Sequence, residues 1–121
     1  MSEEDFSKGS NRTDSGSEED GILNLGSKIE LSGFRDIDRA SMVIIKKITG
    51  SYLKRYDEIS QNIEKLQIYL KPVHTTEASQ KYEVHAKLID NGSVKTSEHT
   101  DRNLFIVMDK VLNSIEQEIT K

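Results

Sequence analysis

The spacing of apolar residues changes several times between positions 28 and 121, and each change predicts a different element. From Lys65 to Lys71 apolar and polar residues alternate strictly, and the same two-residue period returns over 82–88. Such alternation is typical of strands with one buried face. From Leu104 to Ile119 apolar residues instead recur at steps of three and four, which predicts one face of a helix.

The segment before these strands predicts one further strand and one further helix. A short alternating run over 28–33 ends at Gly33, and apolar residues then follow helical spacing from Ile37 to Ile59. Asp36 or Asp38 can cap this helix, because a carboxylate accepts the free N–H groups of a first helical turn. A glycine at position 50 costs the helix roughly 1 kcal/mol relative to alanine.

The remaining strands are predicted to begin and end at turn residues. The second strand covers 63–71 and stops before Pro72, and 74–80 is a polar loop. The third and fourth strands, 81–89 and 93–98, form a hairpin around Asn91-Gly92, because both central positions of a type I′ turn need positive φ. Thr100 or Asp101 is expected to cap the final helix.

These elements predict an α+β fold in the order β-α-β-β-β-α, with a four-stranded mixed sheet. The crossover through the first helix makes the first two strands parallel. Both helices pack on one face, because only one side of each strand is apolar. The opposite face is expected to be solvated and mildly basic, and to present Lys65, Gln67, Tyr69, Lys71, Glu83, His85, Lys87, Lys95, Ser97 and His99. A unit of this order and size is typical of RNA-binding domains.

Composition divides the 121 residues into two parts. Residues 1–27 are rich in Ser, Gly, Asp and Glu, and they cannot bury enough apolar surface to offset the entropy of ordering them. We therefore expect a disordered acidic tail over 1–27 and one α+β domain over 28–121. The net charge of −4 belongs to residues 1–28, because 14 acidic and 14 basic residues remain after Lys28.

Several classes of protein are disfavoured by the sequence. There is no cysteine, and therefore no disulfide framework or thiolate site. No apolar run approaches the roughly 20 residues of a membrane span, and the acidic N-terminus is unlike a secretory signal, so we expect a cytoplasmic protein with no membrane partner.

Catalytic chemistry also finds little support. His74, His85 and His99 lack the spacing of metal ligands, and neither a nucleophile elbow nor a glycine-rich phosphate loop is present. We expect no enzyme activity, no metal and no cofactor.

Basic residues are better candidates for a binding site. Lys46 and Lys47 are separated by eight positions from Lys54 and Arg55, and Arg102 and Lys110 repeat that separation on the final helix. Two basic stripes on neighbouring helices could follow phosphates and release their counterions. The alternative is that these side chains form ordinary solvated helix faces.

Three segments together resemble the family of short ribosome hibernation-promoting factors, also known as ribosome-associated translation inhibitors. They are the opening I-E-L-S-G strand at 29–33, the helix end L-K-R-Y-D-E-I at 53–59 followed by an I-Y-L-K strand, and the closing helix D-R-N-L-F-I-V-M-D-K-V-L-N-S-I-E-Q-E-I-T-K at 101–121. The likeness lies in their order and spacing, and it covers about 28–121.

The resemblance implies a monomer that binds RNA in the decoding channel of the small ribosomal subunit and represses translation during ribosome hibernation, a stress response. The RNA contacts it implies are Lys47, Lys54, Arg55, Arg102 and Lys110; Lys46 and Lys87 are added as candidates. Two alternatives remain open. One is a module like the double-stranded-RNA-binding domains with another RNA target, and the other is a protein-interaction domain that uses the polar sheet face and the acidic tail.

Overall fold

The computed structural model describes residues 16–19, 22–25, 28–71 and 81–120 of the chain. Their elements, in chain order, are β2 (Gly16–Glu19), β3 (Ile22–Leu25), β4 (Ile29–Ser32), α1 (Arg39–Ile59), β5 (Ile63–Lys71), β6 (Tyr82–Asp90), β7 (Ser93–Asp101) and α2 (Leu104–Ile119). The predicted tail residues 1–15 and the predicted polar loop at 74–80 lie outside the described residues.

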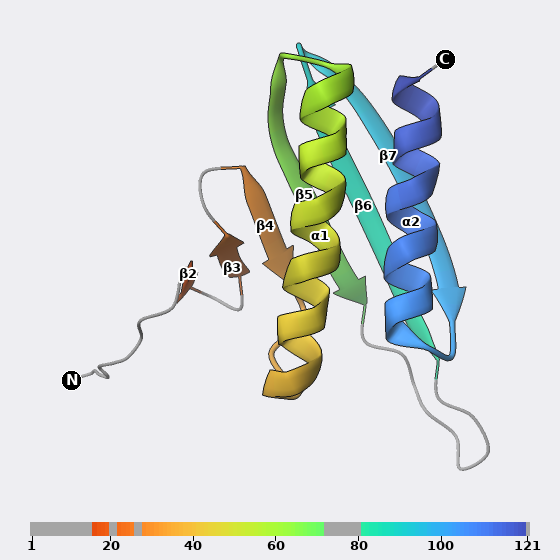
Figure 1. Ribbon diagram of the computed structural model, residues 1–121. Coiled ribbons are helices and arrows are strands. Elements are labelled where there is room, and N and C mark those ends of the chain that lie inside the picture. The colour runs from red at the N-terminus through yellow and green to blue at the C-terminus, as the bar shows by residue number, and fades with distance from the viewer. Residues whose placement is uncertain (1–15, 20–21, 26–27, 72–80, 121) are drawn as a thin grey trace.

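The strands form one sheet, and the two helices lie side by side on one of its faces (Figure 1). The strand order is β2-β3-β4-β5-β6-β7. Strand β4 pairs with β5 in parallel, and the other neighbouring pairs are antiparallel. From β4 to α2 the predicted α+β order and mixed sheet are confirmed.

Two short strands, β2 and β3, fall inside the segment for which composition predicts disorder. Strand β3 pairs antiparallel with β4, and Leu25 at its end packs partly buried against the core. The backbone of β3 gains pairing partners because it lies along the edge of β4 that β5 leaves open. The sheet therefore has two strands beyond the four predicted, and disorder over the rest of 1–27 stays a prediction.

The core lies between the helices and the inward side of the central strands. Its fully buried members include Leu66, Ile68, Val84 and Leu88 from the sheet. Helix α2 contributes the largest set, Val107, Met108, Val111, Leu112 and Ile115. The steps of three and four between these α2 positions are those that the sequence predicts.

One predicted helix cap is confirmed and the other is wrong. Asp38 caps α1, and its Oδ2 accepts a hydrogen bond from the Ser41 N–H at 3.0 Å. Asn103, rather than Thr100 or Asp101, caps α2 and accepts from the two N–H groups of Phe105 and Ile106. Strand β7 extends through Asp101, three residues beyond its predicted end, so the helix begins later.

The register of β7 also corrects the predicted composition of the open sheet face. The Asn91-Gly92 turn has φ values of 52° and 83°, as predicted, and it pairs Ile89 with Val94. This register sets His99 opposite the buried Val84, on the helix side, where His99 Nε2 lies 2.9 Å from Ser114 Oγ of α2. Lys95 and Ser97 share that side, because they pair with the buried Leu88 and Ala86. The side chains of Val94, Thr96, Glu98 and Thr100 belong to the open face instead.

Two glycines give a matched pair of stability predictions. Gly50 is exposed within α1, and a Cβ there meets no atom within 4 Å. Gly50→Ala should therefore raise the free energy of unfolding by about 1 kcal/mol in urea denaturation. Gly33 has a φ of +83°, and its Cβ would clash with the Leu70 carbonyl oxygen, so Gly33→Ala should lower that free energy. A loss of stability in Gly50→Ala would contradict an uninterrupted α1.

Two N-terminal deletions separate the edge strands from the residues before them. Deleting 1–15 should leave the melting temperature nearly unchanged, as the composition predicts. Deleting 1–26 also removes the pairing of β3 with β4 and the packing of Leu25. If this loss is about 1 kcal/mol, the melting temperature should fall by about 4–8 °C in a thermal melt followed by circular dichroism. Equal melting temperatures for the two deletions would show that β3 adds nothing to the domain.

Candidate nucleic-acid interface

The two helices carry opposite charge. Helix α1 contains five Lys or Arg residues and two acidic residues, whereas α2 contains one Lys and three acidic residues. Because the helices lie side by side on one sheet face (Figure 1), a helix rich in basic residues lies next to one rich in acidic residues. The basic part of the candidate interface is therefore α1 alone.

Lys47 and Lys54 form the most accessible basic pair. They are seven positions apart, which is just under two turns, so they lie on the same side of α1 about 10.5 Å apart along its axis. This side is opposite the buried residues Ile45, Tyr52 and Tyr56. Both lysines are exposed, and neither forms an ion pair with any residue that the structure describes. Their charges are available to a ligand.

Lys46 and Arg55 do not extend this pair into the predicted stripe. They are nine positions, or two and a half turns, apart and thus point to opposite flanks of α1. Arg55 faces α2, where its Nη2 lies 2.7 Å from Glu116 Oε1 and its guanidinium carbon lies 4.5 Å from the centre of the Tyr52 ring. Two helical turns take 7.2 residues, so residues eight positions apart are rotated about 80° from each other around the helix. For this reason the two predicted pairs do not form one stripe.

A second basic stripe on α2 is also missing. Arg102 is exposed in the turn before α2, and Lys110 lies within the helix. Lys110 Nζ is 3.2 Å from Asp101 Oδ2, and this ion pair connects α2 to the end of β7. The pKa of Asp101 is lowered, first by the hydrogen bond from the Asn103 N–H and then by that from Lys110.

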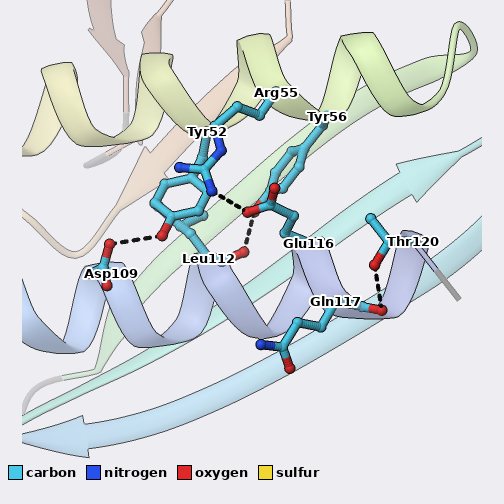
Figure 2. A network of polar contacts seen from close by, with 8 residues as sticks. All are labelled: Tyr52, Arg55, Tyr56, Asp109, Leu112, Glu116, Gln117 and Thr120. Atoms are coloured by element: carbon cyan, nitrogen blue, oxygen red, sulfur yellow. Dashed lines mark hydrogen bonds and ion pairs between the residues drawn. The ribbon is translucent and has the colours of Figure 1, made fainter.

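A network of polar contacts joins α1 to α2 (Figure 2). The Tyr52 hydroxyl donates to Asp109 Oδ1 at 2.7 Å, and the buried Tyr56 hydroxyl donates to the Leu112 carbonyl at 2.6 Å. Asp109 and Glu116 hold α1 through Tyr52 and Arg55. Their seven-residue separation places both on one side of α2 and is the signal that could have identified them.

Lys87 lies apart from the other candidate residues. It belongs to β6 and pairs in register with Gln67 and Thr96 on the open face, so the whole sheet separates it from the exposed side of α1. On this face His85 lies between two carboxylates, with Nε2 2.6 Å from Glu83 and Nδ1 3.2 Å from Glu98. The described residues contain no group of three or more His, Cys, Asp or Glu that could hold a metal ion.

Comparisons with known proteins identify the fold. No protein-family model matches the sequence, and no curated protein matches it either. Among solved structures, a ribosomal subunit interface protein from Coxiella burnetii matches with a TM-score of 0.53 and 16% identity, over 77% of this chain and 91% of that one. The N-terminal domain of Protein Y from Thermus thermophilus matches with a TM-score of 0.52 and 16% identity, over 76% and 91%.

The resemblance expected from the sequence is confirmed in the fold. At 16% identity the likeness concerns the arrangement of helices and strands, and it does not carry over individual binding residues. No helix among the described residues is long and apolar enough to cross a membrane.

The contacts between α1 and α2 predict a specific loss of stability at alkaline pH. Burial, followed by the hydrogen bond to Asp109, raises the pKa of Tyr52 to about 12, above the value of 10.0 for a free tyrosine. Because the folded pKa is the higher one, the stabilisation is complete below pH 10 and is lost as the pH rises toward about 12. The free energy of unfolding should fall across this window.

Tyr52→Phe is the matched variant, because it keeps the ring beneath Arg55 and removes the titrating hydroxyl. Its stability should be lower than that of the unaltered chain at pH 8, and the difference between the two should shrink as the pH rises. Urea denaturation at several pH values measures both. A constant difference up to pH 12 would mean that folding does not raise the pKa of Tyr52.

Proposed function

We propose that this protein binds the RNA of the small ribosomal subunit in the decoding channel and represses translation, without catalysis and as a monomer. The observation that supports this most is that Lys47 and Lys54 are exposed on the outer side of α1 and form no ion pair with any described residue, in a fold shared with a ribosomal subunit interface protein. The ligand is RNA, and the proposed effect on translation is to promote ribosome hibernation.

The electrostatics of α1 suit a phosphate backbone. Each lysine that neutralises a phosphate releases a condensed counterion, so the affinity falls as salt rises. Lys47 and Lys54 can make such contacts without first breaking an internal ion pair, whereas Arg55 would have to leave Glu116. We therefore assign the direct contacts to these lysines, with Lys46 and Arg102 at the margins, and assign Arg55 the task of orienting α1 against α2.

Repression by this domain requires only that it occupies the decoding channel. A domain seated in the channel through which messenger and transfer RNA pass excludes both by volume, and no bond in the RNA has to be made or broken. The net negative charge of α2 also limits how the domain can approach RNA, because phosphates repel carboxylates. We expect α1 to face the RNA and α2 to lie farther from it.

Reversing the charge of two lysines tests this proposal. Lys47→Glu with Lys54→Glu should abolish pelleting with purified small subunits at low salt and relieve the inhibition of translation in vitro, because the new carboxylates repel the RNA. Each exposed substitution should change the free energy of unfolding by no more than about 0.5 kcal/mol. Co-sedimentation, a translation assay and a thermal melt provide the three measurements.

Two controls make the result specific. Glu58→Lys with Asp57→Asn adds positive charge near the end of α1 and should leave binding intact or strengthen it. Val84→Asp places a carboxylate in the core and should unfold the domain. If the double lysine variant folds normally and still pellets and inhibits like the unaltered chain, α1 is not the interface. Equal affinity for any free RNA duplex would favour the double-stranded-RNA-binding alternative.

A further inference from the structure

A hollow of about 720 Å³ lies on the open face of the sheet, on the side away from α1 and α2. Two rows of residues cross four strands to form it. The register places the first row, called here the aromatic row, as Ser32, Tyr69, His85 and Glu98. The second, called the polar row, is Glu30, Gln67, Lys87 and Thr96. All eight residues line the hollow.

The aromatic row offers two ring faces to a ligand. Tyr69 is 45% exposed, because no helix covers this face of the sheet. The centre of its ring lies 6.3 Å from that of His85, at an interplanar angle of 46°. An exposed tyrosine at the middle of a four-strand row is the arrangement on which RNA-binding sheets stack unpaired bases. Stacking of this kind tolerates any base, since each has a π face.

Most of the charged side chains in the hollow contact another described residue, and one does not. Glu30 pairs with Lys65 at 2.8 Å, and the same carboxylate accepts from the Gln67 amide at 2.9 Å. Glu98 contacts His85 at 3.2 Å. Lys87 is exposed and has no acidic partner within the described part of the chain. The hollow thus holds, beside its aromatic row, one cation that has no ion-pair partner among the described residues.

We propose that this hollow binds an unpaired nucleotide of single-stranded RNA, with the base over Tyr69 and His85 and a phosphate beside Lys87. The two rows are two residues apart along the strands, about 6.6 Å, which is the scale of one nucleotide. A duplex backbone is a poor fit, because one free lysine neutralises few phosphates. A basic peptide fits poorly too, because Glu30 is already paired with Lys65 and Lys87 repels it.

This inference goes beyond the proposed function, because the hollow and the exposed lysines of α1 lie on opposite sides of the sheet. The test needs no ribosome. The full chain is titrated with a short single-stranded oligoadenylate, and binding is followed by amide chemical shifts and by tyrosine fluorescence. Tryptophan emission does not mask the tyrosine signal, because the chain contains no tryptophan. Shifts should concentrate in β5, β6 and β7.

Variants of Tyr69 and Lys87 provide the comparison. Tyr69→Leu should weaken binding at least about five-fold, the loss expected for one stacked base, whereas Tyr69→Phe should retain the affinity. Lys87→Gln should reduce the slope of log affinity against log salt by about 0.7, as expected for one single-strand phosphate contact. Lys47→Gln is the control on α1 and should not change the shifts of the sheet. A thermal melt checks that each variant folds.

Three outcomes would overturn the inference. They are an unaltered affinity in Tyr69→Leu, chemical shifts confined to α1, and no response to the oligoadenylate at all. If the sheet responds to isolated ribosomal proteins and not to the oligoadenylate, the hollow is a protein-binding surface instead. Because α1 is not required for this binding, loss of subunit pelleting in the Lys47 and Lys54 variant would leave the result unchanged, so the two proposals fail separately.

Discussion

The buried hydrogen bond from the Tyr56 hydroxyl to the Leu112 carbonyl fixes how α1 lies against α2. Tyr56 is fully buried, and burial raises its pKa, so the hydroxyl stays protonated and keeps donating. An unmet carbonyl or hydroxyl at this depth would cost about 1–3 kcal/mol. The rotation of α1 about its own axis is therefore constrained, and every other residue of that helix takes its direction from this contact.

The direction of the charged residues follows from that rotation. With Tyr52 and Tyr56 turned inward, Arg55 must point to the α2 flank, where Glu116 accepts its charge. Lys47 and Lys54 must point outward, since they lie on the opposite side of the helix. An acidic α2 thus has two effects. It holds α1 in place through Asp109 and Glu116, and it leaves α1 as the basic helix of the pair.

Periodic features of the sequence were sufficient to predict most of the fold. The strand predicted over 63–71, mainly from the strict alternation of 65–71, has the bounds of β5, and Asn91-Gly92 predicted the hairpin, because both depend on local backbone geometry. The face of β7 could not be predicted in the same way. Its inward residues Lys95, Ser97 and His99 are polar, so only the register set by the turn decides which side they occupy. Strand β3 was missed because four residues with a short apolar pattern gain order only from a neighbouring edge.

The candidate site was less predictable than the fold, because a list of basic residues does not show which charges are already neutralised. Arg55 and Lys110 are engaged by Glu116 and Asp101, partners that are 61 and 9 positions away in sequence. The two candidate binding surfaces, the outer side of α1 and the open face of the sheet, therefore have different properties. The outer side of α1 carries unpaired charge and suits long-range, salt-dependent attraction, whereas the open sheet face is nearly balanced and suits short-range stacking. A ligand that needs both properties has to pass around the edge of the sheet, and a structured RNA with an unpaired strand beside a helical backbone has the required shape.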